Sequence, residues 1–436
     1  MIRIYTVEKA KETILKRTAL EKYAPATLER TAALFGEGVT PPQAVAQIIN
    51  TIEAEGDTAL RKWSTLLDRL DSTDFATPEA ELERAYDQIH EEVRSVIQRS
   101  ARRIRSFHEK QPFTSWLTED MGGQLGQRFT PIERVGVYVP GGTAPLPSSL
   151  LMSVIPAQVA GVQRVIVTTP PNPHASILAA AYFCGVTEVF QIGGAQAIAA
   201  LAFGTQSIPK VDKIVGAGNL FVTLAKQQLY GVVGLDGLAG PTETMVIADD
   251  TADPQWVAAD LLAQAEHDVQ ASAILLTPDE SLADAVRQAV TEQIERLSRK
   301  EIIAISLENK GGIVITASLE EAANLANAYA AEHLCLSVAD PQGLMEQINN
   351  AGGFFLGDHS FEVLGDYVAG PSHIMPTGGT ARFASPLNVL DFVKISSVIA
   401  LDTETSAKLS PIAAAFAETE QLTAHAAAAK ARIEEA

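Results

Sequence analysis

The alternation of two kinds of segment from Arg134 onward most limits what this chain can fold into. Short Val- and Ile-rich runs alternate with longer Ala- and Leu-rich stretches, and the runs are RVGVYVP, VQRVIVTTP, EVFQIGG, DKIVGAG, TMVIADD, SAILLTP, GGIVITA, LCLSVAD and GGFFLGD. Strands that alternate with helices form parallel sheets covered by helices on both faces. So many strands need more than one sheet. The sequence therefore predicts an α/β fold with two doubly wound, incomplete Rossmann-like parallel-sheet domains, plus helical N-terminal and C-terminal arms.

The segments on either side of this region have other patterns. Up to about residue 111, apolar residues recur at three- and four-residue spacing, which is typical of helices. GLDGLAGPTE contains three glycines and a proline before a new strand, so we place the boundary between the two sheets there. After Gly370 the chain is expected to be irregular and to end in an Ala-rich helix from about Pro411.

The charge and the termini exclude several classes of protein. The net charge of −20 argues against binding to nucleic acid or an anionic membrane, because both need Lys and Arg. No apolar run reaches the roughly 18 residues of a membrane span. The N-terminus becomes charged at once, without the apolar region of a signal peptide. We therefore expect a soluble, cytoplasmic protein.

Glycine-rich loops follow several of the predicted strands. PGGTAPLPSS, IGGAQ and VGAGN each place flexible backbone before a helix. The N–H groups and dipole at a helix N-terminus can hold a phosphate. However, the dinucleotide fingerprint G-x-G-x-x-G is absent, and glycine also serves strand-to-helix turns for steric reasons alone. Nucleotide binding and a purely structural role both remain open from these loops.

The tripeptide Ala-Glu-His occurs twice, ending at His267 and at His333. Gln264 and His267 are three residues apart on a helix predicted to start near Pro254, so they should share one face. Histidine is a common zinc ligand, and a Gln oxygen can be another. The alternative is an ordinary polar helix end.

The second copy of this tripeptide could carry acid–base chemistry. Glu332 and His333 are predicted at the end of a helix from about Leu319 to Leu334, just before a strand. Such a pair can move protons near neutral pH. A charged helix end explains the pair equally well.

Two later stretches add polar candidates. Asp366 and His373 lie in GDYVAGPSHIMPTGG, which we predict to be a loop rather than a regular helix. A loop after a strand suits a site at the carboxyl end of a sheet. Glu420 and His425 are predicted on the last helix. An Asp, two His and a Gln could form a set of Zn²⁺ ligands, although the spacing does not show that they meet.

With these residues in view, the sequence resembles the L-histidinol dehydrogenase family over nearly the whole chain. The matching stretches are VGVYVPGGTAPLPSS, GGAQAIAALAFGT, VGAGN, AGPTE, LLAQAEHD, AAEHL, GDYVAGPSHIMPTGGTARF and EQLTAHA. The resemblance implies a zinc-dependent, NAD-dependent alcohol and aldehyde dehydrogenase that oxidises L-histidinol through histidinal to L-histidine, in histidine biosynthesis. It also implies one Zn²⁺ per subunit, two NAD per histidinol, and a homodimer with exchanged C-terminal arms.

The resemblance also implies the roles of individual residues. His333 would be the general base in both oxidations, and Glu332 would activate water. The NAD-contacting positions would be Tyr138, Gln196 and Asn219. The Zn²⁺ ligands would be Gln264, His267, Asp366 and His425. The substrate-contacting positions would be Thr242, His333, His373 and Glu420 together with the Zn²⁺ ligands.

The domain limits expected with this resemblance divide the chain into four parts. Residues 1–29 would form an N-terminal arm, and residues 134–244 the NAD-binding domain. Residues 30–133 and 245–387 would form a larger, discontinuous domain that carries the zinc and catalytic residues. Residues 388–436 would form a C-terminal arm that contributes to the partner's site.

The sequence departs from the family pattern at three positions, and rival functions remain open. Thr242, Ala217 and Ala331 stand where the family usually has Ser, Pro and Pro. The methyl group of Thr242 bears on substrate identity, so a dehydrogenase of the same family acting on another small polar alcohol is the first alternative. A scaffold without activity and a zinc hydrolase that uses no NAD are the others.

Overall fold

The six-stranded sheet contains the chain's N-terminus. In the computed structural model, which describes residues 2–17, 23–70, 74–141 and 145–432, its strand order is β1-β11-β10-β9-β12-β13. All neighbouring strands are parallel. The strands are β1 (Ile4–Thr6), β9 (Glu243–Ala248), β10 (Ser272–Thr277), β11 (Gly312–Ile315), β12 (His333–Ser337) and β13 (Gly353–Leu356).

Helices cover both faces of this sheet, which explains why its strands are continuous apolar runs. In β9, Val246 and Ala248 pack on one face, whereas Met245 and Ile247 pack on the other. The first face is covered by α11 (Pro254–Ala265), α12 (Glu280–Ile294) and α13 (Lys300–Asn309). The second is covered by α1 (Val7–Glu12), α14 (Leu319–Tyr329) and α15 (Pro341–Met345).

The five-stranded sheet is also parallel, in the order β6-β5-β4-β7-β8. Its strands are β4 (Arg134–Tyr138), β5 (Arg164–Thr169), β6 (Val189–Gln191), β7 (Lys213–Val215) and β8 (Gly234–Leu235). The chain proceeds outward from β4 to β6 and then returns to place β7 beside β4. The carboxyl ends of β4 and β7 therefore flank the switch point where open α/β sheets bind ligands.

Two layers of helices cover each face of the five-stranded sheet. On one face, α9 (Gly194–Phe203) and α10 (Leu220–Leu229) share a core with α3 (Pro41–Glu55) and α4 (Asp57–Trp63). On the other, α7 (Pro147–Val159) and α8 (Ala175–Phe183) share a core with α5 (Glu79–Gln88) and α6 (Glu91–His108). Helix α2 (Pro25–Phe35) contacts α3, and a short π-helix, η1 (Ser64–Asp68), follows α4.

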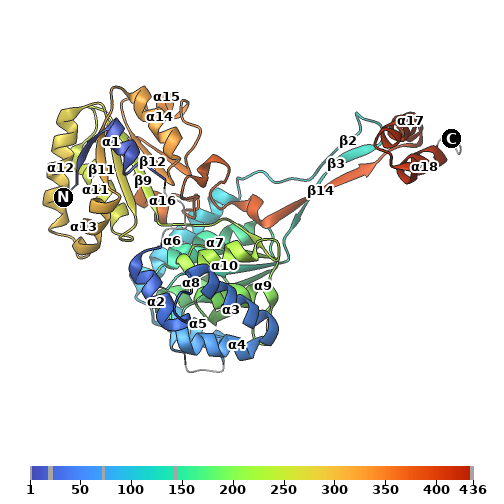
Figure 1. The fold of residues 1–436 in the computed structure, drawn as a ribbon, viewed down its shortest axis with the longest axis horizontal. Coiled ribbons are helices and arrows are strands. Elements are labelled where there is room, and N and C mark those ends of the chain that lie inside the picture. Colours follow the sequence, from blue (N-terminus) through green and yellow to red (C-terminus); the bar gives the residue numbers. More distant parts are fainter. Residues whose placement is uncertain (1, 18–22, 71–73, 142–144, 433–436) are drawn as a thin grey trace.

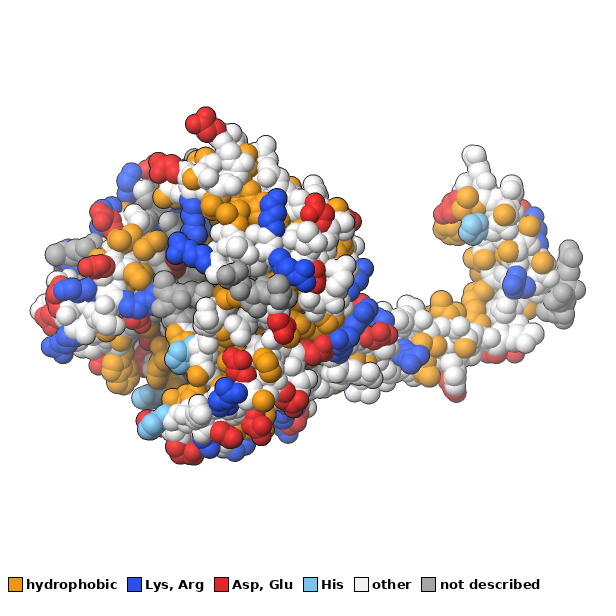
Figure 2. All heavy atoms as spheres, turned by 90° about the horizontal axis from the view of Figure 1, so that it is seen from below, with side chains coloured by type: hydrophobic (Ala, Val, Ile, Leu, Met, Phe, Trp, Pro, Cys, Tyr) orange, Lys and Arg blue, Asp and Glu red, His pale blue; other side chains and the backbone are white. Residues whose placement is uncertain are grey.

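An arm extends from these two units (Figure 1). It is an antiparallel sheet in the order β14-β3-β2, formed by β2 (Trp116–Thr118), β3 (Gln124–Pro131) and β14 (Val393–Ala400). At its tip, α17 (Thr403–Thr419) and α18 (Thr423–Ala431) pack on each other. Figure 2 shows hydrophobic side chains along the arm, and Ile399, Ile412 and Phe416 are 74%, 61% and 68% exposed.

The structure confirms the predicted fold class, and each predicted Val- and Ile-rich run contains a strand. Three local predictions were wrong. Helix α14 ends at Tyr329 rather than near Leu334, because Ala330 adopts a left-handed backbone with φ of 55°. Asp366 lies on a short helix, α16 (Glu362–Tyr367), rather than in a loop. The region after Gly370 contains strand β14, and its helix begins at Thr403, well before Pro411.

The predicted domain limits remain a prediction. The helices between residues 41 and 108 pack against the five-stranded sheet's own helices. This packing favours grouping those residues with 134–244 rather than with 245–387. The first residues also do more than form an arm, because β1 is the edge strand of the six-stranded sheet.

Candidate active site

The predicted catalytic residues lie at the amino edge of the six-stranded sheet. His333 is the first residue of β12, and it pairs in register with Thr244 of β9. Glu332 and Thr242 directly precede the same two strands. The sequence suggested a site at the carboxyl end of a strand, and for this sheet the structure places it at the opposite end. Residues at the start of buried strands are held by the ladder that follows them.

Glu332 is a buried carboxylate with two donors on one oxygen. Its Oε2 accepts a hydrogen bond from the Thr242 hydroxyl at 2.6 Å and from the Glu243 backbone N–H at 2.9 Å. Burial raises the pKa of Glu332 to about 7, although the neighbouring His333 and these donors oppose the rise. A carboxyl group with a pKa near neutral can both take up and release a proton at cellular pH.

His333 is held in one ring orientation by the protein. Its Nδ1 lies 3.2 Å from the Glu243 carbonyl oxygen, which requires an N–H at that position. Its Nε2 is buried, lies 3.7 Å from Asp366 Oδ1, and has no hydrogen-bond partner among the described residues. Burial opposes the charged ring, but the carboxylates of Glu362, Glu332 and Asp366 outweigh it and raise the pKa of His333 to about 10.

The three predicted Zn²⁺ ligands of the main body belong to this cluster. Gln264 is buried at the end of α11, where its amide group lies between the Thr242 hydroxyl and the carboxyl group of Glu362. His267 follows that helix and is partly open to solvent, but the protein packed around its ring lowers its pKa despite the opposing charge of Asp366. Burial would raise the pKa of Asp366, but the nearby His333 ring holds it below its ordinary value.

This donor set fits Zn²⁺, because a neutral imidazole, an ionised carboxylate and an amide oxygen are the forms that bind it. The set is incomplete within one chain. Among the described residues, no group of three or more His, Cys, Asp and Glu is arranged to hold a metal ion. Only His267 and Asp366 of the predicted ligands in the main body are of these types, and Gln264 would be a third ligand through its amide oxygen.

His373 connects this cluster to the five-stranded sheet. Its Nδ1 donates to the Asp366 carbonyl oxygen at 2.6 Å, and its Nε2 accepts from the Ser149 hydroxyl at 3.2 Å. Ser149 lies in the first turn of α7, which follows the carboxyl end of β4. The carboxyl edge of the five-stranded sheet therefore faces the amino edge of the six-stranded sheet.

Two predicted NAD-contacting residues, Tyr138 and Gln196, lie on that carboxyl edge. Both side chains are buried, and the Tyr138 hydroxyl accepts from the Gly194 N–H at 3.1 Å. Asp68 was not predicted as a site residue, and its Oδ2 accepts from the Gly193 N–H at 3.2 Å and from Gln196 Nε2 at 2.9 Å. Protein groups thus already occupy two N–H donors at the start of α9, which argues against phosphate binding at those two groups.

Asn219, the third of these residues, is exposed at the N-terminus of α10. Its Oδ1 accepts from the N–H groups of Phe221 and Val222 at 3.0 and 3.2 Å. The preceding Gly216 has φ of +107°, and a Cβ there would lie 2.2 Å from the Tyr138 carbonyl oxygen. Glycine at this position lets the ends of β4 and β7 approach closely at the switch point.

Glu420 and His425 are not part of the cluster within this chain. Glu420 directly follows α17 and His425 lies on α18, so both are exposed residues at the tip of the arm (Figure 1). The structure therefore brings together the predicted site residues of the six-stranded sheet and separates these two from them.

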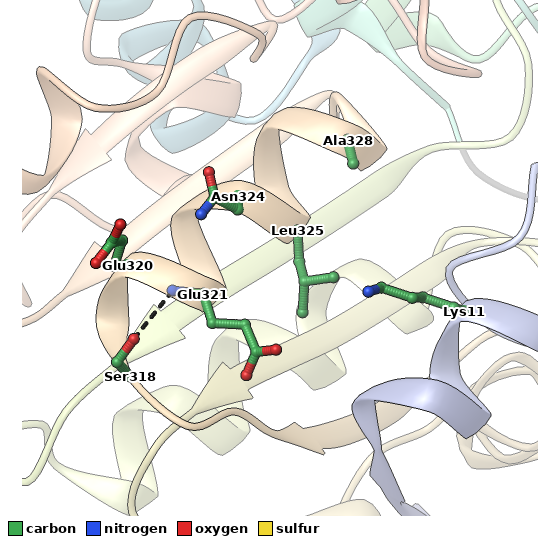
Figure 3. A pocket seen from close by; sticks show the side chains of 7 residues that line it. All are labelled: Lys11, Ser318, Glu320, Glu321, Asn324, Leu325 and Ala328. Carbon is green, nitrogen blue, oxygen red and sulfur yellow. Dashed lines mark hydrogen bonds between the residues drawn. The ribbon is translucent and has the colours of Figure 1, made fainter.

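A pocket elsewhere on this sheet has none of this chemistry. Figure 3 shows it between α1 and α14, with a volume of about 420 Å³, lined by Lys11, Ser318, Glu320, Glu321, Asn324, Leu325 and Ala328. Ser318 caps α14 by accepting from the Glu321 N–H at 3.2 Å. These helices follow the carboxyl ends of β1 and β11, the edge opposite to Glu332 and His333.

Fold and site together fit an α/β dehydrogenase, in which a switch-point edge of one parallel sheet faces the buried side chains of Glu332 and His333 on another. The family model of histidinol dehydrogenase matches residues 39–433. The chain belongs to the histidinol dehydrogenase family, and it is therefore an NAD-dependent oxidoreductase, as the sequence predicted.

Individual relatives agree with this membership. The chain is 49% identical over 414 residues to histidinol dehydrogenase of Deinococcus radiodurans, covering 94% of each chain. It is 48% identical to that of Geobacillus kaustophilus, over 90% of this chain and 94% of the relative. The crystal structure of histidinol dehydrogenase from Elizabethkingia anophelis superposes with a TM-score of 0.91 at 34% identity, covering 100% of this chain and 98% of that one. Within the described part of the chain, no helix could cross a membrane.

Proposed function

We propose that this protein oxidises L-histidinol to L-histidine through histidinal, with two NAD per histidinol, as the last steps of histidine biosynthesis. The observation that carries the proposal is the cluster of Glu332, His333, Asp366 and Gln264 at an edge that faces the NAD-type switch point. Names of relatives at close to half identity support the same reaction.

His333 takes the proton in each oxidation. Because Nδ1 donates to the Glu243 carbonyl, Nε2 is the atom that can accept the alcohol proton as hydride leaves carbon for NAD. Its lack of a partner among the described residues suits contact with a substrate hydroxyl. Bound at Gln264, His267 and Asp366, Zn²⁺ would anchor the substrate and offset the carboxylates that raise the pKa of His333.

Glu332 serves the second oxidation. An aldehyde has no hydroxyl proton to lose, so water must first add to it and form a gem-diol. The Glu332 carboxylate can take a proton from that water, and its pKa of about 7 suits this task. The gem-diol then loses hydride to a second NAD and a proton to His333, which leaves a carboxylic acid, and this acid ionises to the carboxylate product by releasing a further proton to water.

We infer that the site is completed by a second copy of the chain. The arm projects from the body, its apolar side chains are exposed, and it carries Glu420 and His425 at its tip (Figure 1). An element exchanged between identical chains gives a symmetric dimer without a new kind of contact. His425 of one chain would then supply the fourth Zn²⁺ ligand of the other, with Glu420 beside the substrate.

The reaction is tested by counting NADH formed per histidinol consumed. Two NADH per histidinol, with histidine as product, is the expected result. A single NADH, or faster turnover of another small polar alcohol from a panel, would contradict the proposed substrate. Zinc is tested by elemental analysis of His267→Ala, which should lose bound zinc and keep its fold.

The shared site is tested by mixing two inactive variants, His425→Ala and His267→Ala, after dissociation and reassociation. In a mixed dimer one site has both lesions and the other has neither. If half the dimers are mixed, roughly a quarter of wild-type activity should return. A mixture that stays inactive, with mixed dimers confirmed by mass, would rule out the exchanged arm.

A further inference from the structure

Arg17 connects two segments that are far apart in the sequence. Its guanidinium forms an ion pair with Glu243, in which Nη2 lies 2.9 Å from Oε2. The same group donates to the Tyr329 carbonyl from Nη2 at 2.6 Å and from Nε at 3.1 Å, and to the Ala330 carbonyl at 3.3 Å. It also stacks 3.6 Å from the centre of the Tyr329 ring. Arg17 thus holds the start of β9 against the end of α14.

These two segments lead directly to the catalytic pair. Two residues after Ala330, the chain reaches Glu332 and His333. The Glu243 backbone N–H donates to Glu332 Oε2 at 2.9 Å, and its carbonyl oxygen accepts from His333 Nδ1 at 3.2 Å. A single residue therefore orients both catalytic side chains through its main chain, while Arg17 fixes its side chain.

A third segment meets at the same carboxylate. The Gly378 N–H donates to Glu243 Oε1 at 3.1 Å, and Thr377 Oγ accepts from the Gly240 N–H at 2.6 Å. This loop follows His373, which contacts the cluster from the other side. Glu243 is 6% exposed, so its charge depends on Arg17 and this N–H for compensation.

We propose that Arg17 is a positioning residue for the oxidation chemistry, acting through Glu243 to fix Glu332 and His333. It touches neither of these side chains, and its planar fork matches the Glu243 carboxylate and the helix-end carbonyls together. The inference rests on the proposed function, because the roles of Glu332 and His333 come from there. Without the Arg17 guanidinium, the start of β9 and the residues that lead into β12 can shift relative to each other.

The test uses Arg17→Ala and Arg17→Lys in the full-length protein. In Arg17→Ala, kcat for histidinol should fall by roughly 10²-fold, because a misplacement of about 1 Å at the reacting groups has that effect. The KM values for histidinol and NAD, and the bound zinc, should stay near wild type. Arg17→Lys keeps the charge without the fork, so its kcat should lie between the two. Added guanidinium ion should restore part of the activity of Arg17→Ala, and sodium chloride of equal ionic strength should not.

The matched control is Arg3→Ala. Arg3 also lies in the N-terminal segment and pairs with a distant carboxylate, that of Glu308, at 3.2 Å. This ion pair is on the surface, since the Arg3 and Glu308 side chains are 56% and 65% exposed. This variant should keep wild-type kcat and show no guanidinium effect. A kcat of Arg17→Ala equal to that of Arg3→Ala would overturn the proposal. The proposal would also be overturned if Arg17→Ala raised the KM values for histidinol and NAD equally and added guanidinium ion did not restore its activity. If Arg17→Ala does not fold, a wild-type kcat in Arg17→Lys overturns it.

Hydrogen exchange supplies a readout that does not depend on activity. In Arg17→Ala, amides in residues 242–246 and 329–334 should exchange faster than in the wild type, and Arg3→Ala should leave them unchanged. If the wild type forms no NADH from histidinol, the proposed function fails, but hydrogen exchange still tests whether Arg17 holds these two segments together. If the wild type is active and these amides are unaffected, only the role of Arg17 fails.

Discussion

The two parallel sheets of this protein are built alike and used at opposite edges. Each is buried between helices on both faces, and its strands are continuous apolar runs. The five-stranded sheet presents its carboxyl edge, where Gly193, Gly194 and Gly216 precede or begin helices. The six-stranded sheet presents its amino edge, where Glu332 and His333 enter β12.

The two edges therefore offer different chemistry. A carboxyl edge followed by helices supplies positive helix ends, which suit a dinucleotide. An amino edge supplies side chains whose backbone is fixed by the hydrogen bonds between the strands that follow. At this edge, the main chain of Glu243 contacts the side chains of both Glu332 and His333. The predicted NAD-contacting residues Tyr138 and Gln196 and the predicted acid–base pair thus lie at the edges of separate sheets. Variants at one edge should change catalysis, and variants at the other should change cofactor binding.

The largest effect is expected for His333→Asn. This change removes the base needed each time hydride leaves, so kcat should fall by about 10²- to 10⁴-fold on histidinol and on histidinal alike. The KM for NAD should change little, because the change is confined to the six-stranded edge. The control is His174→Asn, since His174 caps α8 and Asn caps helices well. Normal turnover of either substrate by His333→Asn would contradict its role.

A smaller and selective loss is expected for Glu332→Gln. Glutamine keeps the size and can accept from Thr242, but it cannot take a proton from water. Histidinal oxidation should fall by about 10²-fold, and oxidation of histidinol to histidinal should fall less. Single-turnover measurements with each substrate give the comparison. Equal losses in the two steps would mean that Glu332 does not act on water.

At the other edge, Asp68→Ala should weaken NAD binding. It removes the acceptor of Gly193 and Gln196, and hydrogen bonds to a charged group contribute about 1.5–3 kcal/mol, so the KM for NAD should rise about tenfold or more. Asp68→Asn should restore much of the loss.

Asp212→Ala is the matched control for Asp68→Ala, because Asp212 pairs with Arg134 at 3.1 Å on the amino edge of the same sheet. Its KM for NAD should stay near that of the wild type. A rise in the KM for histidinol rather than for NAD in Asp68→Ala would contradict the assignment of NAD binding to the five-stranded sheet and of catalysis to the six-stranded sheet.

The smallest effect is expected for Thr242→Ser, which restores the residue usual in the family. The hydroxyl that donates to Glu332 is kept, and only one methyl group is lost. A methyl group contributes about 1 kcal/mol, so the change in kcat/KM for histidinol should stay under about tenfold. A much larger gain on histidinol, with a loss on another polar alcohol, would show that this methyl group selects a different substrate.

Much of the site could be identified from the sequence by resemblance, but its geometry could not. The Val- and Ile-rich runs predicted the strands, because strands buried on both faces must be apolar throughout. The helix predicted to reach Leu334 ends at Tyr329. This end was not predicted because nothing in the local sequence marks Ala330 as left-handed. Strand β14 was missed because most of its side chains are exposed and it is stabilised by pairing with β3.

Asp68 and Arg17 were missed for a different reason. Neither belongs to a motif, and each acts on residues more than a hundred positions away in the sequence, Gln196 for one and Glu243 for the other. Charged residues in helical or irregular segments are usually solvated, so local pattern gives them no distinction. Only the packing of distant segments makes them partners of buried polar groups.

By itself, the sequence determined the doubly wound class, the positions of the buried strands and the residues able to bind metal or move protons. These follow from hydrophobic periodicity and side-chain chemistry, which are local properties. The tertiary structure decided which edge of each sheet carries function and which residues meet there. It also decided that Glu420 and His425 lie on an arm apart from Glu332 and His333 of the same chain. Such choices depend on long-range strand order and on the packing of one unit against another, and no local pattern encodes either.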